Sequence, residues 1–166
     1  CQAVDPGLPP ARVTGLPWGA QPEDRLSWSA RQDVERGKPE RALVQVATIL
    51  LKKPRHVDAN RLRQDLLRER GRRGRLLMEA KQRVHDWPDD GHAHYLLARI
   101  LDDPKAKLRG FQRAARLAPD SMWPWLGLAH TLRGVDRARS LAIYERLFAA
   151  AAQHPLVAVA YASALR

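Results

Sequence analysis

Apolar residues recur along most of the chain at intervals of three or four, the spacing that places side chains on one face of an α-helix. The first such run steps by four residues before it meets Gly37: Leu26, Ala30 and Val34. A second apolar face begins after Pro39. Proline is favoured in the first turn of a helix and glycine just past its end. The pattern therefore predicts two helices joined by a tight turn.

The residues that punctuate these helices return at a fixed distance. Gly37 and Gly71 are 34 residues apart, and so are Pro54 and Pro88. A period of this length, with Gly between two helical segments and Pro closing the unit, is typical of an array of helical repeats. We expect helix pairs near residues 23–53, 57–86, 91–118 and 121–153, followed by a single helix over 156–166.

The later repeats carry a specific motif. The third pair reads His94-x2-Leu97-Ala98-x2-Leu101 and then Phe111-x2-Ala114-x4-Pro119, and the fourth opens with Trp125-x2-Leu128-Ala129-x2-Leu132. These segments resemble the tetratricopeptide repeat (TPR) family, with Ala98 as the small residue that lets helices approach closely. A register starting at Trp123 is the alternative. Trp125 is preferred because it stands as far from the preceding Pro as His94 does.

The resemblance implies an all-α fold, a right-handed superhelical solenoid of antiparallel helix pairs over residues 23–166. The second pair departs from the family pattern because nothing aromatic stands at its start. The longest apolar runs, such as residues 147–152, are far shorter than the roughly 20 residues of a membrane-spanning helix.

The formal charge of +11 is concentrated in one segment. Between Lys52 and Arg83 there are 12 Lys or Arg residues against 4 Asp or Glu, which accounts for +8 of the total. Such an excess favours an anionic neighbour: an acidic protein segment, lipid headgroups or nucleic acid. The alternative is a solvated basic helix face with no specific partner.

The chain begins with its single cysteine, Cys1, and residues 1–22 are rich in Pro, Gly and Ala. This arrangement resembles a mature bacterial lipoprotein, whose first residue is a lipid-bearing Cys followed by a flexible tether. Pro-rich segments behave as extended spacers, which fits a tether. The resemblance implies anchoring at the periplasmic face of the outer membrane. The alternative is an arbitrary start that falls on Cys.

The sequence contains no recognisable catalytic constellation. It has no Gly-rich phosphate loop, no His-Glu-x2-His pair and no nucleophile elbow. His92 and His94 come closest to a metal pair, but residues two apart on a helix point in different directions. We therefore expect no enzyme activity, no metal and no cofactor.

What remains is a binding surface. In TPR arrays the first helix of each pair lines a concave groove for a partner's peptide segment. Carried over by register, the groove positions are Trp28, Arg31, Asn60, Arg61, Gln64, Arg68, Tyr95, Arg99, Trp123, Leu126 and His130. Aromatic residues and Arg often anchor interfaces. The alternative is that Trp28, Tyr95 and Trp123 fill the seams between repeats.

Some TPR proteins clamp the C-terminal carboxylate of a partner with Lys, Asn and Arg. The corresponding positions here hold Ser27, Arg31, Arg61, His92 and Leu96. That clamp is therefore not expected, although the Arg residues suit an acidic or mixed segment through charge-assisted contacts.

Together these features favour a non-enzymatic scaffold, a lipid-anchored cell-envelope protein that holds a partner protein during assembly of a larger complex. The alternative is a cytoplasmic helical-repeat protein that binds RNA or another polyanion through residues 52–83. Against nucleic acid, this segment contains no Phe, Tyr or Trp on which bases could stack.

Overall fold

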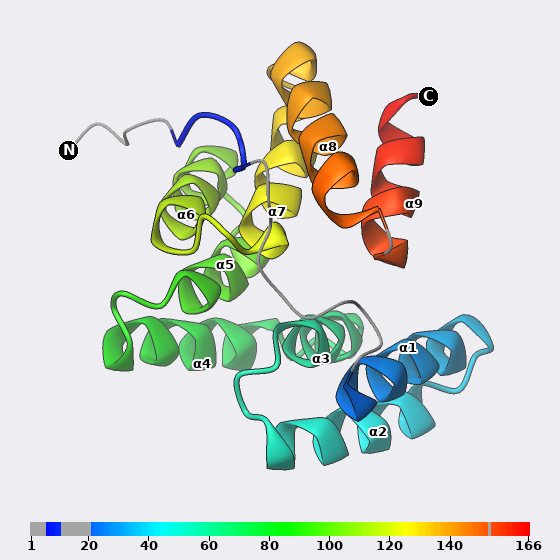
Figure 1. The fold of residues 1–166 in the computed structure, drawn as a ribbon. Helices are drawn as coiled ribbons and strands as arrows, with labels where there is room; N and C mark the ends of the chain where they lie inside the picture. The colour runs from blue at the N-terminus through cyan, green and yellow to red at the C-terminus, as the bar shows by residue number, and fades with distance from the viewer. Residues whose placement is uncertain (1–5, 11–20, 153) are drawn as a thin grey trace. The chain divides into compact units, whose positions relative to one another are not determined.

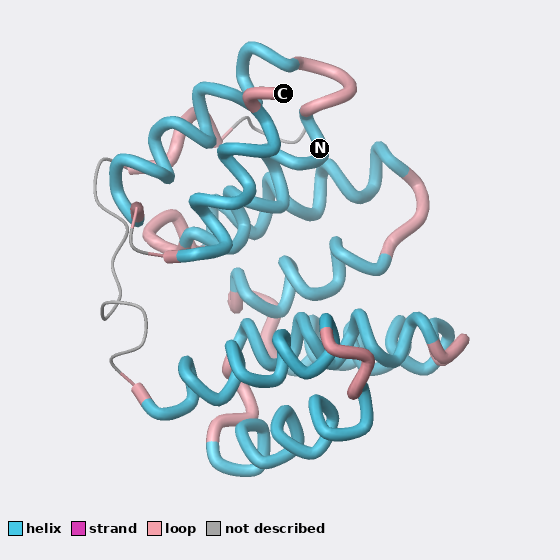
Figure 2. Tube along the Cα trace, turned by 90° about the vertical axis from the view of Figure 1, so that its right-hand side faces the viewer, coloured by secondary structure: helices cyan, strands magenta, loops and turns pink. Residues whose placement is uncertain are grey.

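A computed structural model describes residues 6–10, 21–152 and 154–166 of the chain. These residues form nine helices and no strand, and short loops join consecutive helices (Figures 1 and 2). The helices are α1 (Pro22–Glu35), α2 (Pro39–Lys52), α3 (Val57–Glu69), α4 (Arg73–Asp86), α5 (Gly91–Ile100), α6 (Pro104–Leu117), α7 (Met122–Leu132), α8 (Arg137–Ala151) and α9 (Pro155–Ala164). The predicted all-α helical-repeat fold is confirmed, and α1 packs on α2, α5 on α6 and α7 on α8 as the predicted pairs require.

Local sequence signals account for the helix ends. Proline opens α1, α2, α6 and α9, where its missing N–H costs no intrahelical hydrogen bond. Gly37 and Gly71, which follow α1 and α3, have φ of +72° and +71°. Residues with a Cβ rarely adopt this left-handed conformation. Glycine is therefore the favoured residue at the ends of α1 and α3.

The chain divides into two compact units, which α4 links along the sequence. The N-terminal unit comprises residues 16–78, and the C-terminal unit comprises residues 79–166 together with residues 1–15. In the N-terminal unit α1 packs on α2, α2 on α3, and α1 on α3. Its core consists of Ala30, Ala42, Val46, Ile49, Ala59, Leu62 and Leu66. The three alanines allow the helices to approach closely.

In the C-terminal unit each helix from α5 to α9 packs on the next, and α5 also contacts α7. The largest buried side chains are Tyr95, Trp125, Ile143, Tyr144 and Leu147. A methyl group placed on Gly110 of α6 would lie 2.8 Å from the Cβ of Ala98 in α5. Ala98 therefore has the close-approach role that the motif predicted.

One polar contact recurs from repeat to repeat. The side chains of Asn60, His94 and Trp125 each contact the carbonyl oxygen of a proline six residues earlier in the chain, at 2.7–2.9 Å. These prolines are Pro54, Pro88 and Pro119. Trp125 is 1% exposed and occupies the same place as His94. The structure thus supports the register that begins at Trp125.

The leading residues that the structure describes belong to the C-terminal unit. In residues 6–10, the ring of Pro9 is fully buried, and its carbonyl oxygen accepts a hydrogen bond of 2.9 Å from Nε of Arg146 in α8. Cys1 and most of the predicted tether lie outside the described residues. No helix in the described ranges is both long and apolar enough to cross a membrane.

Candidate partner-binding faces

The predicted groove residues lie on the first helix of each pair, and they form one face in each unit. The N-terminal face comprises Trp28 and Arg31 of α1 with Asn60, Arg61, Gln64 and Arg68 of α3. The C-terminal face comprises Tyr95 and Arg99 of α5 with Trp123, Leu126 and His130 of α7.

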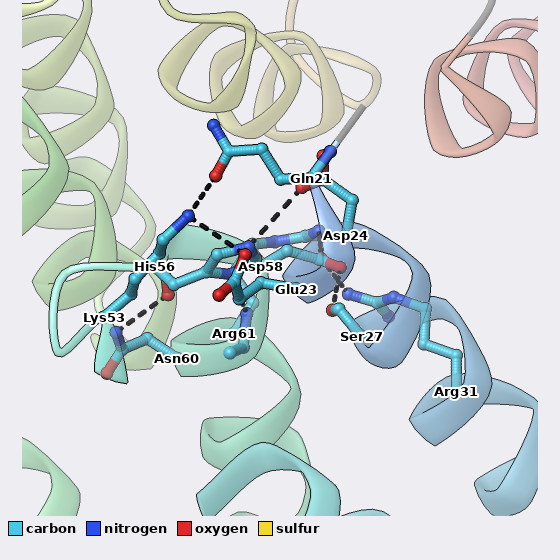
Figure 3. A network of polar contacts seen from close by, with 11 residues as sticks. Gln21, Glu23, Asp24, Ser27, Arg31, Lys53, His56, Asp58, Asn60 and Arg61 are labelled. Atoms are coloured by element: carbon cyan, nitrogen blue, oxygen red, sulfur yellow. Dashed lines mark hydrogen bonds and ion pairs between the residues drawn. The ribbon is translucent and has the colours of Figure 1, made fainter. Parts of the chain in front are cut away.

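Asp58, in the first turn of α3, is the centre of the N-terminal face. Its carboxylate accepts hydrogen bonds from the hydroxyl of Ser27 and from the guanidinium of Arg31, both in α1. Arg61, one turn along α3, donates a third at 3.1 Å. Figure 3 shows the three donors gathered about this carboxylate. The cluster links α1 to α3. Its two guanidinium groups and one carboxylate leave a net charge of +1.

The environment of Asp58 shifts its pKa strongly. Burial alone would raise the pKa, but the charges of Arg31 and Arg61 and the hydrogen bonds from Arg31 and Ser27 outweigh it and lower the pKa to about 2. Asp58 is therefore ionised at any physiological pH. Charge-assisted hydrogen bonds of this kind are among the stronger polar contacts in proteins.

A second set of polar contacts lies at the same end of α1 and α3. Nζ of Lys53 pairs with Glu23 at 3.0 Å and also contacts the side chain of Gln21. The hydrogen bond from Lys53 is the main reason that the pKa of Glu23 is lowered. Nε2 of His56 lies 3.5 Å from Asp24, while its Nδ1 accepts from the backbone N–H of Ala59. These contacts attach the α2–α3 loop to the start of α1 (Figure 3).

Several cations of the basic segment 52–83 form ion pairs with acidic side chains of the same chain. Arg68 pairs with Asp65 at 3.2 Å, and Arg70 pairs with Glu40 of α2. Lys53 and Arg61 are engaged as described above. Glu23 and Glu40 lie outside the segment, so the local excess of charge is smaller in the fold than in the sequence.

The C-terminal face is built around a row of rings. Tyr95 and Trp123 have ring centroids 6.5 Å apart, and the ring of His154, at the start of α9, meets Trp123 edge-on at 5.4 Å. Trp123, Leu126 and His130 succeed one another at spacings of three and four, so they share one face of α7. Tyr95 is only 2% exposed, whereas Trp123 is partly accessible.

Two cations lie near His130 on this face. The pKa of His130 is lowered by partial burial and by the charges of Arg133 and Lys107. The imidazole is therefore neutral at pH 7, and the positive charge here comes from the Arg and Lys side chains. Arg99 of α5 adds a further cation.

A known structure resembles this chain. The crystal structure of a thermophilic TPR protein of Thermus thermophilus superposes with a TM-score of 0.56 and 20% sequence identity, and the match covers 89% of this chain and 83% of that one. The chain has the TPR fold. No family model matches the sequence, and no curated protein is significantly similar to it.

Within this TPR fold, the predicted groove residues separate into two groups. Asn60, Gln64, Tyr95 and Leu126 are buried, and Asn60 binds the carbonyl oxygens of Pro54 and His56. The residues that keep accessible surface are Trp28, Arg31, Arg61, Arg68, Arg99, Trp123 and His130. A role in partner binding stays a prediction for all of them.

The two His residues considered as a metal pair have separate neighbours in the TPR fold. Nε2 of His92 lies 2.9 Å from the hydroxyl of Ser121, and Nε2 of His94 lies 2.7 Å from the carbonyl oxygen of Pro88. In the described part of the chain, no group of three or more His, Cys, Asp or Glu side chains is placed to hold a metal ion.

Sequence reasoning missed Asp58 and His154. Asp58 stands in the first turn of a helix, where an acidic residue is expected simply for its interaction with the helix dipole. Its partner Arg31 is 27 residues away, and nothing in the local pattern connects the two. His154 follows the fourth pair as an N-cap, and its contact with Trp123 depends on how α9 packs.

Proposed function

We propose that this protein is a non-enzymatic scaffold that holds an acidic or mixed segment of a partner protein on the first helices of its repeats. The observation that carries the proposal is the TPR fold, in which α1 packs on α3 and α5 packs on α7. Side-by-side first helices present side chains from successive repeats to the same extended ligand. Within one unit, a peptide can therefore contact the first helices of two successive repeats.

The C-terminal face has suitable chemistry for such a segment. Trp123 supplies a rigid apolar surface that contacts the rings of Tyr95 and His154. Lys107 and Arg133 supply positive charge around His130, which shares this face of α7 with Trp123, and Arg99 lies in the last turn of α5. An apolar anchor surrounded by cations favours a ligand that combines one large apolar side chain with Asp or Glu.

The N-terminal face contributes a fixed positive charge. Arg31 and Arg61 are held in place by Asp58, so their guanidinium groups lose little conformational freedom when a ligand carboxylate approaches. Two cations against one anion leave a net charge that attracts an acidic segment.

Site-specific photo-crosslinking tests this proposal. A photoreactive residue replaces Trp123 in one variant and Arg113, an exposed residue of α6, in a control. We expect a crosslinked partner protein from position 123 and none from position 113, and we expect Arg99→Glu to abolish the crosslink. An equal yield from both positions, or a crosslink that Arg99→Glu leaves intact, would refute binding at this face.

We further propose that the scaffold is anchored by lipid on Cys1 at the periplasmic face of the outer membrane. The support is the resemblance of residues 1–22 to a lipoprotein N-terminus. Acyl chains contribute roughly 0.8 kcal/mol for each buried methylene, so a multiply acylated Cys would hold the chain firmly on a bilayer.

The mass of the N-terminal peptide from the native membrane fraction tests the anchor. We expect a mass excess that decreases when ester-linked acyl chains are released, and we expect Cys1→Ser to move the chain out of the membrane fraction. An unmodified Cys1 would rule out the anchor while leaving the scaffold proposal standing.

A further inference from the structure

The segment 6–10 is bound to α8 much as a peptide ligand binds a receptor. Its sequence is Pro-Gly-Leu-Pro-Pro. The carbonyl oxygen of Pro9 accepts from Nε of Arg146 at 2.9 Å, and that of Gly7 accepts a longer bond of 3.4 Å from Arg139. The ring of Pro9 is fully buried, while Leu8 remains 47% exposed. The contact combines one buried anchor with two backbone acceptors.

These contacts match what a proline-containing segment without secondary structure requires. Such a segment forms no internal hydrogen bonds, so its carbonyl oxygens need donors from elsewhere. Arg139 and Arg146 are seven residues apart in α8, which places them on one face of the helix two turns apart. The two acceptors, Gly7 and Pro9, are two residues apart in the segment, and each accepts from one of the two donors.

The backbone of the segment also has a defined shape. Gly7 has φ of +75°, and a methyl group built on it would meet nothing within 4 Å. Space therefore does not require glycine here, whereas the left-handed conformation does favour it. Glycine at this position thus allows the bound conformation without strain.

We propose that the α8 face with Arg139 and Arg146 is a docking site for short proline-containing segments, which residues 6–10 occupy within the same chain. The site is separate from the proposed partner-binding faces, because α8 is the second helix of its pair. A partner segment of the same chemistry reaches the site only by displacing residues 6–10, so the N-terminal segment acts as a built-in competitor.

Peptide binding to the full-length chain tests the proposal. The probe is a fluorescein-labelled peptide with the sequence of residues 5–11. The receptor is a full-length variant in which alternating Gly and Ser replace residues 6–10. A segment tethered in the same chain competes at an effective concentration of about 1 mM. The competition factor is one plus this concentration divided by the dissociation constant of the probe, so a probe that binds the variant with a constant of about 0.1 mM should bind the natural chain about tenfold more weakly.

Two substitutions on α8, each made in the variant whose residues 6–10 are replaced, identify the site. Arg146→Gln should weaken probe binding at least tenfold, whereas Arg137→Gln, which removes the same charge from the start of the same helix, should leave it unchanged. Circular dichroism checks that each variant remains helical. The proposal fails if the folded variant binds no probe at millimolar concentration, if the natural chain binds it equally well, or if both substitutions act alike.

Discussion

Because Asp58 lies between Arg31 and Arg61, its charge both compensates two partly buried cations and ties α1 to α3. A buried carboxylate that loses its charge leaves its partners without compensation, which costs more than the pair itself contributes. At the scale of single residues, this cluster is where a small chemical change has the largest expected effect on stability.

Replacing Asp58 by Asn tests how much this cluster contributes to stability. We expect Asp58→Asn to lower the free energy of unfolding by about 2–4 kcal/mol, since Arg31 and Arg61 then lack their anion. The matched control is Asp65→Asn, which removes an exposed pair with Arg68 and should cost less than about 0.5 kcal/mol. Urea unfolding measures both variants. Equal effects would show that Asp58 has no special role.

The lowered pKa of Asp58 also predicts a pH dependence. The carboxyl has an ordinary pKa of 3.8 and a folded-state pKa of about 2, so the folded state favours the ionised form. The shift corresponds to about 2 kcal/mol of stability that is fully present well above pH 3.8. It is lost as the pH falls from about 3.8 toward 2.

Urea unfolding between pH 6 and pH 2 measures this dependence. The stability difference between the natural chain and Asp58→Asn should shrink across the lower half of that range. A difference that stays constant to pH 2 would contradict the assignment of the lowered pKa to this group.

At the scale of helices, the turns after α1 and α3 depend on glycine for a conformational reason. Gly37 and Gly71 have positive φ, whereas Gly134, in the turn between α7 and α8, does not. All three have open space where a Cβ would stand. We expect Gly37→Ala and Gly71→Ala each to cost about 1 kcal/mol, and Gly134→Ala to be neutral or slightly stabilising. Thermal unfolding of the three variants distinguishes conformational strain from steric crowding.

The recurring contact to a proline carbonyl joins the second, third and fourth helix pairs to the loop that precedes each of them. In the fourth pair, Nε1 of Trp125 donates to Pro119 at 2.8 Å from a fully buried ring. Trp125→Phe keeps most of the apolar volume but leaves that carbonyl oxygen without its donor. We expect a loss of about 1–3 kcal/mol in the free energy of unfolding, measured in urea. An unchanged stability would mean that water replaces the indole there.

For the whole molecule, helices within each unit contact mainly their neighbours along the chain. Stability in such an array is approximately a sum of local terms. We therefore expect Asp58→Asn to raise amide hydrogen exchange most in α1 and α3 and least in α8 and α9. Exchange followed by mass spectrometry measures this gradient. A uniform increase over all helices would indicate a single cooperative unit instead.

The helices, the residues that begin and end them and the all-α fold follow from local patterns in the sequence. Pro22 and Pro39 at helix starts and Gly37 and Gly71 at helix ends act through their own backbone conformations, so their effect is visible locally. The 34-residue period then implies that each pair packs like the next.

Which polar groups meet depends on the packing of residues that are distant in the sequence. Asp58 and Arg31 are 27 residues apart, and Arg146 and Pro9 are 137 apart, so no local pattern links either pair. The structure also showed that Asn60 and Tyr95, both predicted for the groove, are buried. Periodicity indicates which side of a helix is polar or apolar. It does not indicate which groups face one another, because that depends on how separate helices pack.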